Sequence, residues 1–553
     1  MSLIKEIMSP WQRLVGLLRL EKKAIKQVIY YAIFSGLVAL TLPLGIQAII
    51  NLIQGAQVST SWIVLVILVT VGVSFVGVLQ LMQMRIIETI QQRIFTRASF
   101  EFTYRFPKIK MSALRHYYPP ELANRFFDTL TIQKGLAKVL VDVPAAILQI
   151  VFALILLSFY HPFFIAFGVL LILLIYVVFR YTAKRGMETS LLESKHKYKV
   201  AHWIQEVART IVSFKLSGKT KLSIDKNDNL VEAYLEARED HFKILIIQFI
   251  QMIGFKVLVT AGLLIIGGLL VLNQEMNIGQ FVAAEIIILL VINSVEKLIL
   301  GLESFYDVLT SLEKMGQVVD KELEDQEGLQ PNFQEQFTLE LNEVSYNVPD
   351  REKHILNKVS LKIQPQSRLL IKGASGSGKS TLLRLISGVI APTKGQIYIN
   401  ESNIHNINLN YYRSHLGLSL ADESLFEGTI RENITFGSKD ISDDQLLKVT
   451  KQVGLTDFIK ENLNGLDTIL YPEGKRTSFT VVKRIVLARA IIDAPKLLIL
   501  EDPLEHFEAE EASEIIDMLT SKSNPWALIV VSTNDTWSKR CSQVITLENG
   551  EII

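Results

Sequence analysis

The stretch RLLIKGASGSGKSTLLRLISG, Arg368–Gly388, contains the phosphate-loop pattern G-x-x-x-x-G-K-[ST]. The fixed positions of the pattern are Gly373, Gly378, Lys379 and Ser380. A short apolar run typical of a buried strand precedes the loop and a helical pattern follows it, which is the context in which this pattern holds phosphate. The glycines let backbone N–H groups turn toward phosphate oxygens, and the start of the helix adds the positive end of its dipole. The stretch therefore predicts a nucleoside triphosphate site in an α/β domain.

Each position of this loop has an expected role. Lys379 is expected to reach the outer phosphates, and the Ser380 hydroxyl is expected to bind Mg²⁺. The residues expected to contact the triphosphate are Gly373, Ala374, Ser375, Gly376, Ser377, Gly378, Lys379, Ser380 and Thr381. The alternative interpretation is a glycine-rich turn without a ligand.

A second stretch, KLLILEDPLEHF at Lys496–Phe507, places two acids at the tip of an apolar strand. The acids are Glu501 and Asp502. Two neighbouring carboxylates at the end of a buried strand are candidates for a functional role. The alternative is that they only cap a helix beginning near Pro503.

The first 300 residues are much more apolar than the rest. The chain has 553 residues, of which 49% are hydrophobic, and its mean hydropathy is +0.30. Single apolar segments of this kind can be helices of a soluble core, but a series of them with near-membrane lengths predicts membrane helices. Six segments pass or nearly pass the length test: Ile29–Leu52, Trp62–Met82, Ala145–Tyr160, Phe163–Phe179, Ile247–Leu272 and Ile278–Leu300.

The loops between these segments predict the orientation. The connections Gln54–Ser61, Tyr160–Pro162 and Asn273–Asn277 contain no Lys or Arg, whereas Arg85–Pro144 and Arg180–Lys243 are rich in both. By the positive-inside rule, the basic connections and both termini are cytoplasmic. The sequence therefore predicts a multi-pass protein of the cytoplasmic membrane.

Charge and cysteine content exclude other classes. The formal net charge of +1 lacks the basic surplus of a nucleic-acid binder, and the single cysteine, Cys541, excludes an internal disulfide framework. The opening MSLIKEIMSPWQRLVGLLRLEKK is amphipathic and basic without a cleavage site, which favours a membrane-surface helix over a signal peptide. The expected organisation is a surface helix at 1–26, six membrane helices within 27–312, a linker at 313–336 and an α/β nucleotide-binding domain at 337–553.

Taken together, six membrane helices followed by a phosphate-loop domain resemble an ABC transporter, specifically a half-transporter of the exporter type. Three local stretches are similar to family motifs: the second cytoplasmic loop at Glu206–Lys221, the stretch after the Q-loop at Ser424–Gly437 and the helix after the signature at Arg484–Ile492. The first membrane helix and the PEGK segment resemble type I secretion and peptide exporters. The resemblance implies ATP and Mg²⁺ as cofactors, a homodimer or a heterodimer with a second half-transporter, a periplasmic adaptor as a partner and a peptide or protein cargo.

Several motifs depart from the family pattern. The family's Walker B strand ends in Asp then Glu, the first acid holding Mg²⁺ through water and the second polarising the attacking water. Here the order is reversed, so the resemblance gives the metal role to Glu501 and the base role to Asp502, which is one methylene short. A catalytic group misplaced by about 1 Å costs on the order of a hundredfold in rate.

The other hydrolysis motifs are also altered. Where the family has Leu-Ser-Gly-Gly-Gln, the chain reads TSFTV, and only Ser478 matches. The Q-loop glutamine aligns with Ala421, the switch histidine with Thr533 and the adenine-stacking aromatic with Val348. The prediction is ATP binding with slow hydrolysis. The alternative is a catalytically degenerate subunit whose ATP binding gates or scaffolds a partner.

Charged residues also occur inside the predicted membrane helices. At about 1.5 Å per residue from the outer loop, Lys256 lies about 25 Å deep, Glu296 about 28 Å and Glu285 only about 11 Å. Lys256 and Glu296 are therefore expected at one depth. Glu285 either faces a wet translocation cavity or is hydrogen-bonded inside the helix bundle.

Overall fold

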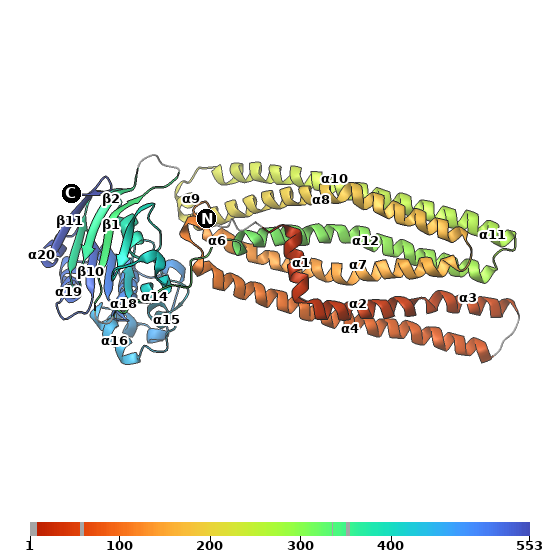
Figure 1. The fold of residues 1–553 in the computed structure, drawn as a ribbon, viewed down its shortest axis with the longest axis horizontal. Coiled ribbons are helices and arrows are strands. Elements are labelled where there is room, and N and C mark those ends of the chain that lie inside the picture. The colour runs from red at the N-terminus through yellow and green to blue at the C-terminus, as the bar shows by residue number, and fades with distance from the viewer. Residues whose placement is uncertain (1–7, 56–59, 334–335, 350–353) are drawn as a thin grey trace. The chain divides into compact units, whose positions relative to one another are not determined.

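The chain forms two compact units (Figure 1). The computed structural model describes residues 8–55, 60–333, 336–349 and 354–553. Met1–Lys108 and His116–Lys321 form a helical unit, and Ile109–Arg115 with Glu322–Ile553 form a mixed α/β unit. The predicted fold class is confirmed. Parts of the expected surface helix, the first outer loop and the linker, residues 1–7, 56–59 and 334–335, lie outside the described residues.

The helical unit consists of long helices packed side by side. Its helices are α1 (Pro10–Leu20), α2 (Lys22–Ala39), α3 (Thr41–Gln54), α4 (Thr60–Arg105), α6 (Pro119–Ala123), α7 (Asp128–Ser158), α8 (Phe163–Arg209), α9 (Ile211–Leu216), α10 (Leu222–Gly262), α11 (Gly268–Leu272) and α12 (Ile278–Val319). A π-helical turn, Leu263–Gly267, joins α10 to α11. Four short helices connect α4 to α7: η1 (Phe106–Lys108), α6, η2 (Asn124–Phe127) and α5 (Met111–Leu114), which belongs to the α/β unit.

Five helical segments in the described residues are long and apolar enough to cross a membrane. They correspond to five of the six predicted spans, although the third, Ala145–Tyr160, extends two residues past the end of its helix at Ser158. The fourth predicted span begins α8, whose described apolar stretch is Phe163–Leu173. The first predicted span is not one helix: it is divided at Leu40 between α2 and α3. Pro43 explains the break, because a proline has no N–H to donate to the carbonyl four residues earlier.

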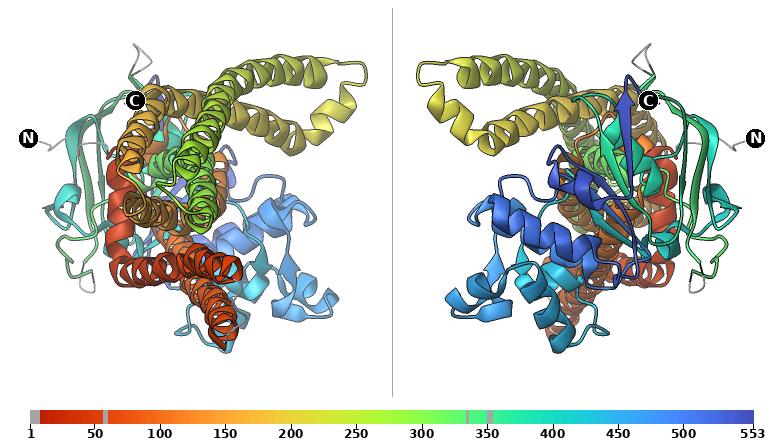
Figure 2. Two further views of the ribbon diagram at one scale, coloured as in Figure 1. Left: turned by 90° about the vertical axis from the view of Figure 1, so that its right-hand side faces the viewer. Right: turned by 90° about the vertical axis from the view of Figure 1, so that its left-hand side faces the viewer.

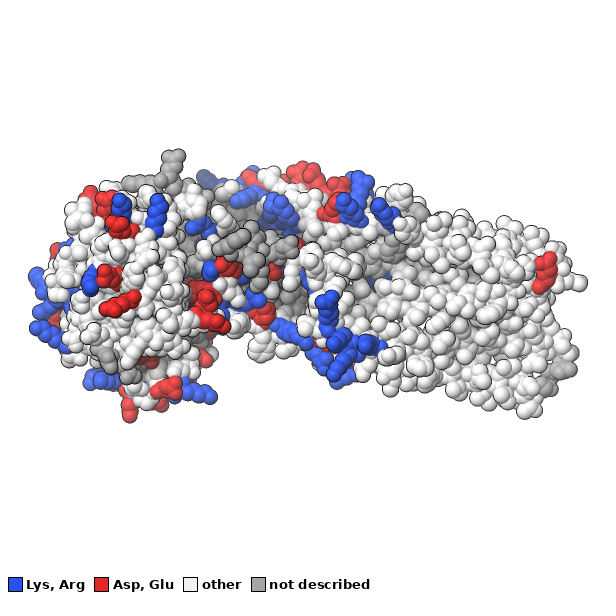
Figure 3. Space-filling model, viewed as in Figure 1, with Lys and Arg blue, Asp and Glu red and all other residues white. Residues whose placement is uncertain are grey.

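Charge is distributed very unevenly over the helical unit. On the face shown in Figure 3, the part that carries α3 and α11 is almost free of charged side chains. The Lys256 ammonium lies 2.6 Å from the Glu296 carboxylate, so the predicted match in depth is confirmed. Glu285 is half-buried, and among the described residues no hydrogen bond or ion pair reaches it.

Two helices leave the rest of this unit at one end. The hairpin of α8 and α10, closed by α9, projects away from the other helices, as the yellow and yellow-green ribbon of Figure 2 shows. At its other end, α8 is joined to α7 by the predicted tight turn at His161–Pro162. The projecting part contains most of the basic connection Arg180–Lys243.

Helix α1, in the region of the expected surface helix, begins with a capping box. Ser9 accepts from the backbone N–H of Gln12, the Gln12 side chain accepts from that of Ser9, and a proline occupies the first helical position. Arg13 then donates to the Asp320 carboxylate at 2.9 Å, which connects α1 to the residue after α12. Because α12 continues to Val319, residues 313–319 of the expected linker are helical.

The α/β unit contains three sheets. The strands are β1 (Leu339–Tyr346), β2 (Leu356–Ile363), β3 (Arg368–Lys372), β4 (Lys394–Ile399), β5 (Ser402–Asn403), β6 (Leu416–Ser419), β7 (Gly428–Thr429), β8 (Ile469–Leu470), β9 (Leu497–Glu501), β10 (Ala527–Val531), β11 (Gln543–Glu548) and β12 (Glu551–Ile552). The helices are α5 (Met111–Leu114), α13 (Lys379–Ile386), α14 (Leu409–Arg413), α15 (Ile430–Thr435), α16 (Asp443–Gln452), α17 (Thr456–Glu461), α18 (Phe479–Ile491), α19 (Ala509–Thr520) and α20 (Thr536–Arg540).

The large sheet decides where the site forms. Its order is β12-β11-β3-β10-β9-β6, and every pair except β11 with β12 is parallel. Strands β3, β10 and β9 are buried runs, so the carboxyl ends of all three open on the same edge. Only β10 separates β3 from β9, which places the two carboxyl ends about 10 Å apart. The second sheet, β2-β1-β4-β5, is antiparallel.

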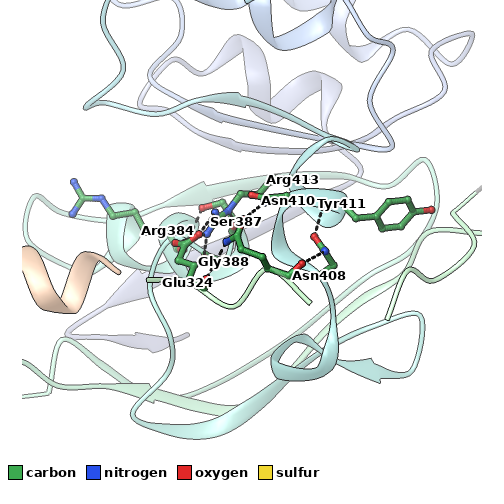
Figure 4. Close-up of polar contacts among 9 residues, drawn as sticks. Glu324, Arg384, Ser387, Gly388, Asn408, Asn410, Tyr411 and Arg413 are labelled. Atoms are coloured by element: carbon green, nitrogen blue, oxygen red, sulfur yellow. Dashed lines mark hydrogen bonds and ion pairs between the residues drawn. The ribbon is translucent and has the colours of Figure 1, made fainter. Parts of the chain in front are cut away.

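The polar stretch after α12 is fixed to the α/β unit. Arg413 holds Glu324 through two ion-pair contacts of 2.6 and 3.0 Å, and it also donates to the Gly388 carbonyl at 2.6 Å (Figure 4). Further along, Gly328 has φ +145°, and a Cβ there would lie 2.6 Å from the Asn408 nitrogen. The described part of the expected linker is thus an ordered strap, which we call the 322–333 strap.

Replacing Arg413 with Gln is expected to loosen the 322–333 strap, because Glu324 would be left partly buried without its cation at a cost of about 1–3 kcal/mol. Hydrogen exchange of the full chain, followed on peptides from the strap, should become roughly tenfold faster. Arg431→Gln is the matched control, since the Arg431–Asp443 pair is largely exposed. Equal acceleration of hydrogen exchange in both variants would contradict the conclusion that Arg413 holds the strap in place.

Replacing Lys256 with Met is expected to destabilise the helical unit, because Glu296 would remain unpaired inside a membrane helix. The double replacement Lys256→Met with Glu296→Met should recover most of the loss, since no charge is then left alone. Thermal midpoints of the protein in lipid nanodiscs measure both effects. A double variant that is less stable than either single variant would argue against a direct pair.

Candidate nucleotide site

The phosphate loop has the shape that the sequence predicts. It connects β3 to α13, and Gly373, Gly376 and Gly378 all have positive φ, at 151°, 81° and 105°. A Cβ at Gly373 would lie 2.2 Å from the Leu547 carbonyl oxygen, and one at Gly378 would lie 2.8 Å from the Ile355 oxygen. These two positions therefore require glycine.

Strand β11 and the turn after it support the loop from behind. In addition to the Leu547 contact, the Gly550 N–H donates to the Ser377 carbonyl at 3.2 Å. Ser377 is buried, whereas Ala374, Ser375 and Gly376 are exposed on the open side. The loop therefore presents a short stretch of accessible backbone directly in front of the N-terminus of α13.

Lys379 and Ser380 begin α13 at the inner side of the loop. The Lys379 ammonium donates to the carbonyls of Gly373 at 2.8 Å and Ala374 at 2.7 Å. The Ser380 hydroxyl donates to the Glu501 carboxylate. Thr381 follows and is half-buried. The ammonium thus lies within the ring of backbone that would surround phosphate oxygens.

Glu501 is the point where the loop meets the Walker B strand. It ends β9 and is 8% exposed. One of its oxygens accepts from Ser380, and the other accepts from the backbone N–H of Ala421 at 3.0 Å. The alternative of a helix cap is wrong, because no helix begins near Pro503 and α19 starts at Ala509.

Asp502 lies one residue further and in a different environment. Its φ is +40°, in the left-handed region, and its backbone N–H donates to the Val531 carbonyl at 2.9 Å. Burial, followed by the nearby carboxylates of Glu505 and Glu501, raises the pKa of Asp502 above its usual value. Both Glu501 and Asp502 line a cavity of about 490 Å³. Asp502 therefore faces a space that can hold water.

The signature position forms a helix start. Ser478 is the N-cap of α18 and accepts from the Val481 N–H at 3.4 Å. The next side chain, Phe479, is 47% exposed and packs edge-on against His506, with ring centroids 5.3 Å apart. An aromatic ring thus covers the position where the family pattern has glycine.

Of the remaining aligned positions, Val348 and Ala421 have apolar side chains, and Thr533 has a hydroxyl in place of the imidazole of the family's switch histidine. Thr533 is exposed, Val348 is half-buried and Ala421 contributes only its backbone N–H. The sequence did not predict the hydrogen bond from the Ala421 backbone N–H to Glu501, because an alanine side chain gives no sign of what its backbone binds. The sequence also missed Arg489, which donates to the Asn433 carbonyl at 2.7 Å behind the cavity.

The donor set suits a hard divalent cation. A serine hydroxyl and a carboxylate, held in direct contact, are oxygen ligands of the kind that Mg²⁺ uses beside phosphate oxygens and water. Among the described residues no group of three or more His, Cys, Asp or Glu side chains forms an all-protein metal site. The arrangement thus fits an ion that is held mainly by nucleotide and water.

Comparison with known families agrees with this geometry. The family model described as ABC transporter transmembrane region matches residues 28–295, and the model described as ABC transporter matches residues 356–505. The structure superposes on the structure of a bacterial Atm1-family ABC exporter with ATP bound, with a TM-score of 0.84 over 97% of this chain and 95% of that chain, at 17% identity.

Two curated relatives illustrate the sequence similarity. The uncharacterized ABC transporter ATP-binding protein YfiB of Bacillus subtilis (strain 168) is 29% identical over 44% of this chain and 42% of its own length. The alpha-hemolysin translocation ATP-binding protein HlyB of Escherichia coli O157:H7 is 29% identical over 55% of this chain and 43% of its own length. The matched stretches therefore span less than half of each relative.

The two family models together cover both units of the fold, the membrane-spanning helices and the phosphate-loop domain. The combination of one transmembrane region and one ATP-binding domain, in the fold of an exporter, leads to one conclusion. This chain belongs to the ABC transporters and has the architecture of an exporter-type half-transporter.

Proposed function

We propose that the protein is the ATP-binding subunit of a dimeric exporter in the cytoplasmic membrane, with both termini in the cytoplasm, and that it hydrolyses ATP slowly. The observation that carries the proposal is the contact between the Ser380 hydroxyl and the Glu501 carboxylate behind the phosphate loop. This contact brings together the two side chains that would hold Mg²⁺ beside a bound triphosphate. It requires the parallel register of β3, β10 and β9.

In this proposal the chain's own groups divide the work of nucleotide binding. Backbone N–H groups from Gly373 to Thr381 and the Lys379 ammonium bind the phosphates. Ser380 and Glu501 orient Mg²⁺, which neutralises phosphate charge when bound. Asp502 is the nearest carboxylate that could orient a water molecule in the adjoining cavity. Its shorter side chain supports slow turnover.

Phe479, at the signature position that would face a partner subunit, also supports slow hydrolysis. In the family, the signature of one subunit closes on the phosphates held by its partner, and glycine allows the close approach. An exposed ring at this position would keep a partner backbone at a distance. A homodimer would repeat the defect in both sites, whereas a second, different half-transporter could supply a complete signature.

The cargo is proposed only by class. The HlyB relative is a translocation protein for alpha-hemolysin, which supports a peptide or protein cargo and a periplasmic adaptor. A second function is favoured by Asp502 and Phe479 together: ATP binding would then gate or scaffold a partner without useful turnover. Binding alone can drive closure, since a ligand shifts an equilibrium by its differential affinity for the two states.

Purified full-length protein is expected to bind ATP in the presence of Mg²⁺, and Lys379→Ala should weaken binding at least tenfold, because it removes the ammonium from the loop. Restoring the family order with Glu501→Asp and Asp502→Glu should raise turnover by about tenfold or more, up to about a hundredfold. Equilibrium binding of labelled ATP and phosphate release measure the two effects.

These measurements separate the two functions. Turnover that disappears in Lys379→Ala and rises in the double exchange supports the slow ATPase. Tight binding with no turnover in either form supports the gate. Failure of the unmodified protein to bind ATP would overturn both.

Glu285 is proposed to face a wet cavity in the helical unit. It is half-buried on α12, and the absence of a described partner favours water over a hydrogen bond within the bundle. Leu68 lies on a different helix, α4, about 11 Å along the helix axis from the first outer loop, and is 53% exposed. It supplies a control at a similar depth.

With Cys541, the single cysteine of the sequence, replaced by Ser, the chain has no other thiol, so a cysteine introduced at Glu285 can be tested alone. Glu285→Cys should react with a charged, membrane-impermeant maleimide at least tenfold faster than Leu68→Cys, because a thiolate forms only where water reaches it. Labelling in membrane vesicles, read by mass spectrometry, measures the rates. Equal, slow labelling would place Glu285 in a dry environment.

A further inference from the structure

A second charged pocket lies entirely within the helical unit, separate from the nucleotide site. Its volume is about 560 Å³, and residues from α6, η2, α8, α10 and α12 line it. Its cations outnumber its carboxylates: it contains Arg125, Lys195, Lys199, Lys226 and Lys314 against Glu121 and Glu206. Such an excess in a concave site attracts an anion.

Arg125 is the innermost of these cations. It is 6% exposed, and one nitrogen donates to the Glu121 carboxylate at 3.2 Å. Its guanidinium carbon lies 3.6 Å from the centroid of the Tyr198 ring. The Nε and Nη1 atoms are buried, and no described residue accepts a hydrogen bond from either. Buried donors of this kind are costly unless an acceptor reaches them, and a guanidinium fork matches an oxyanion.

Lys314 adds a second buried cation. It is 7% exposed, and no described residue forms a hydrogen bond or an ion pair with it. Its ammonium lies 5.6 Å from the centroid of the Tyr198 ring, the same ring that Arg125 covers. Asp128, a buried acid that does not line the pocket, accepts a hydrogen bond from the Tyr198 hydroxyl and also interacts electrostatically with Arg125 and Lys314. It offsets part of their positive charge, and the remaining lysines of the pocket supply the excess.

Two exposed lysines complete the site. Lys195 and Lys199 are one turn apart on α8, where like charges repel each other. Of the carboxylates in the pocket, Glu121 is shared by Arg125 and His202, and Glu206 is bound by Arg209. Neither lysine therefore has an acid of the pocket to itself, and a bound anion would relieve their repulsion.

The location distinguishes a soluble ligand from a lipid headgroup. Helix α8 is continuous from Phe163 to Arg209. Lys195 follows the last residue of the predicted span, Phe179, by about 24 Å along the helix axis. A headgroup at the membrane surface would not reach that far.

We propose that this pocket binds a soluble small molecule carrying a phosphate or polyphosphate group. Arg125 and Lys314 hold the inner phosphate oxygens, and Lys195 and Lys199 hold the outer ones. Trp203, on whose ring the Lys226 ammonium lies at 4.1 Å, packs beside the ligand.

The test uses the full-length protein in phosphatidylcholine nanodiscs with Lys379→Ala, which weakens phosphate binding at the nucleotide loop. Pyrophosphate, titrated at constant ionic strength, should change tryptophan fluorescence saturably, and Trp203→Phe should abolish the change. Lys195→Gln with Lys199→Gln should raise the Kd for pyrophosphate at least tenfold. Lys184→Gln with Lys219→Gln, an equal loss of charge at exposed lysines outside the pocket, should change it less than twofold.

Arg125→Gln should abolish binding, and the exposed-lysine variants keep the test valid if that variant fails to fold. No saturable signal, or equal weakening in the control pair, overturns the proposal. A pyrophosphate affinity that falls when phosphatidylglycerol is added to the nanodiscs also overturns it, since a lipid headgroup would then occupy the pocket.

Discussion

The parallel register of β3, β10 and β9 is the constraint on which the nucleotide site depends. Val531 is paired with both Ile371 and Glu501, so the carboxyl ends of the two outer strands are level. Because of this alignment, a serine at the start of α13 can donate to an acid at the end of β9, although the two residues are far apart in sequence. Substitutions near Ser380 and Glu501 would change the properties of the site, but a shift in the register of one strand would separate these two residues and remove the site.

Most of the architecture could be predicted because it rests on simple patterns. The lengths of the apolar segments predicted the membrane helices, and the spacing of the glycines predicted the phosphate loop. The Lys256–Glu296 pair followed from helix rise alone. Pro43 is a sequence signal for the break at Leu40. The sequence does not predict whether the proline kinks or breaks the helix, because that depends on the packing of neighbouring helices.

Other features depend on contacts that carry no local signal. The backbone N–H of Ala421 reaches Glu501 only because β6 lies beside β9. The stretch from Glu322 to Phe333 has the composition of a linker, yet Arg413 and the backbone around Asn408 hold it in place. The charged pocket at Arg125 likewise collects residues from five helical segments, several of them far apart in the sequence.

The support of the phosphate loop by β11 has a consequence for biosynthesis. The Leu547 carbonyl and the Gly550 N–H fix Gly373 and Ser377, so the loop lacks its back wall until the ribosome has made that strand. The membrane helices come much earlier in translation and can be inserted first. A nascent chain would therefore be anchored in the bilayer before its phosphate loop is complete.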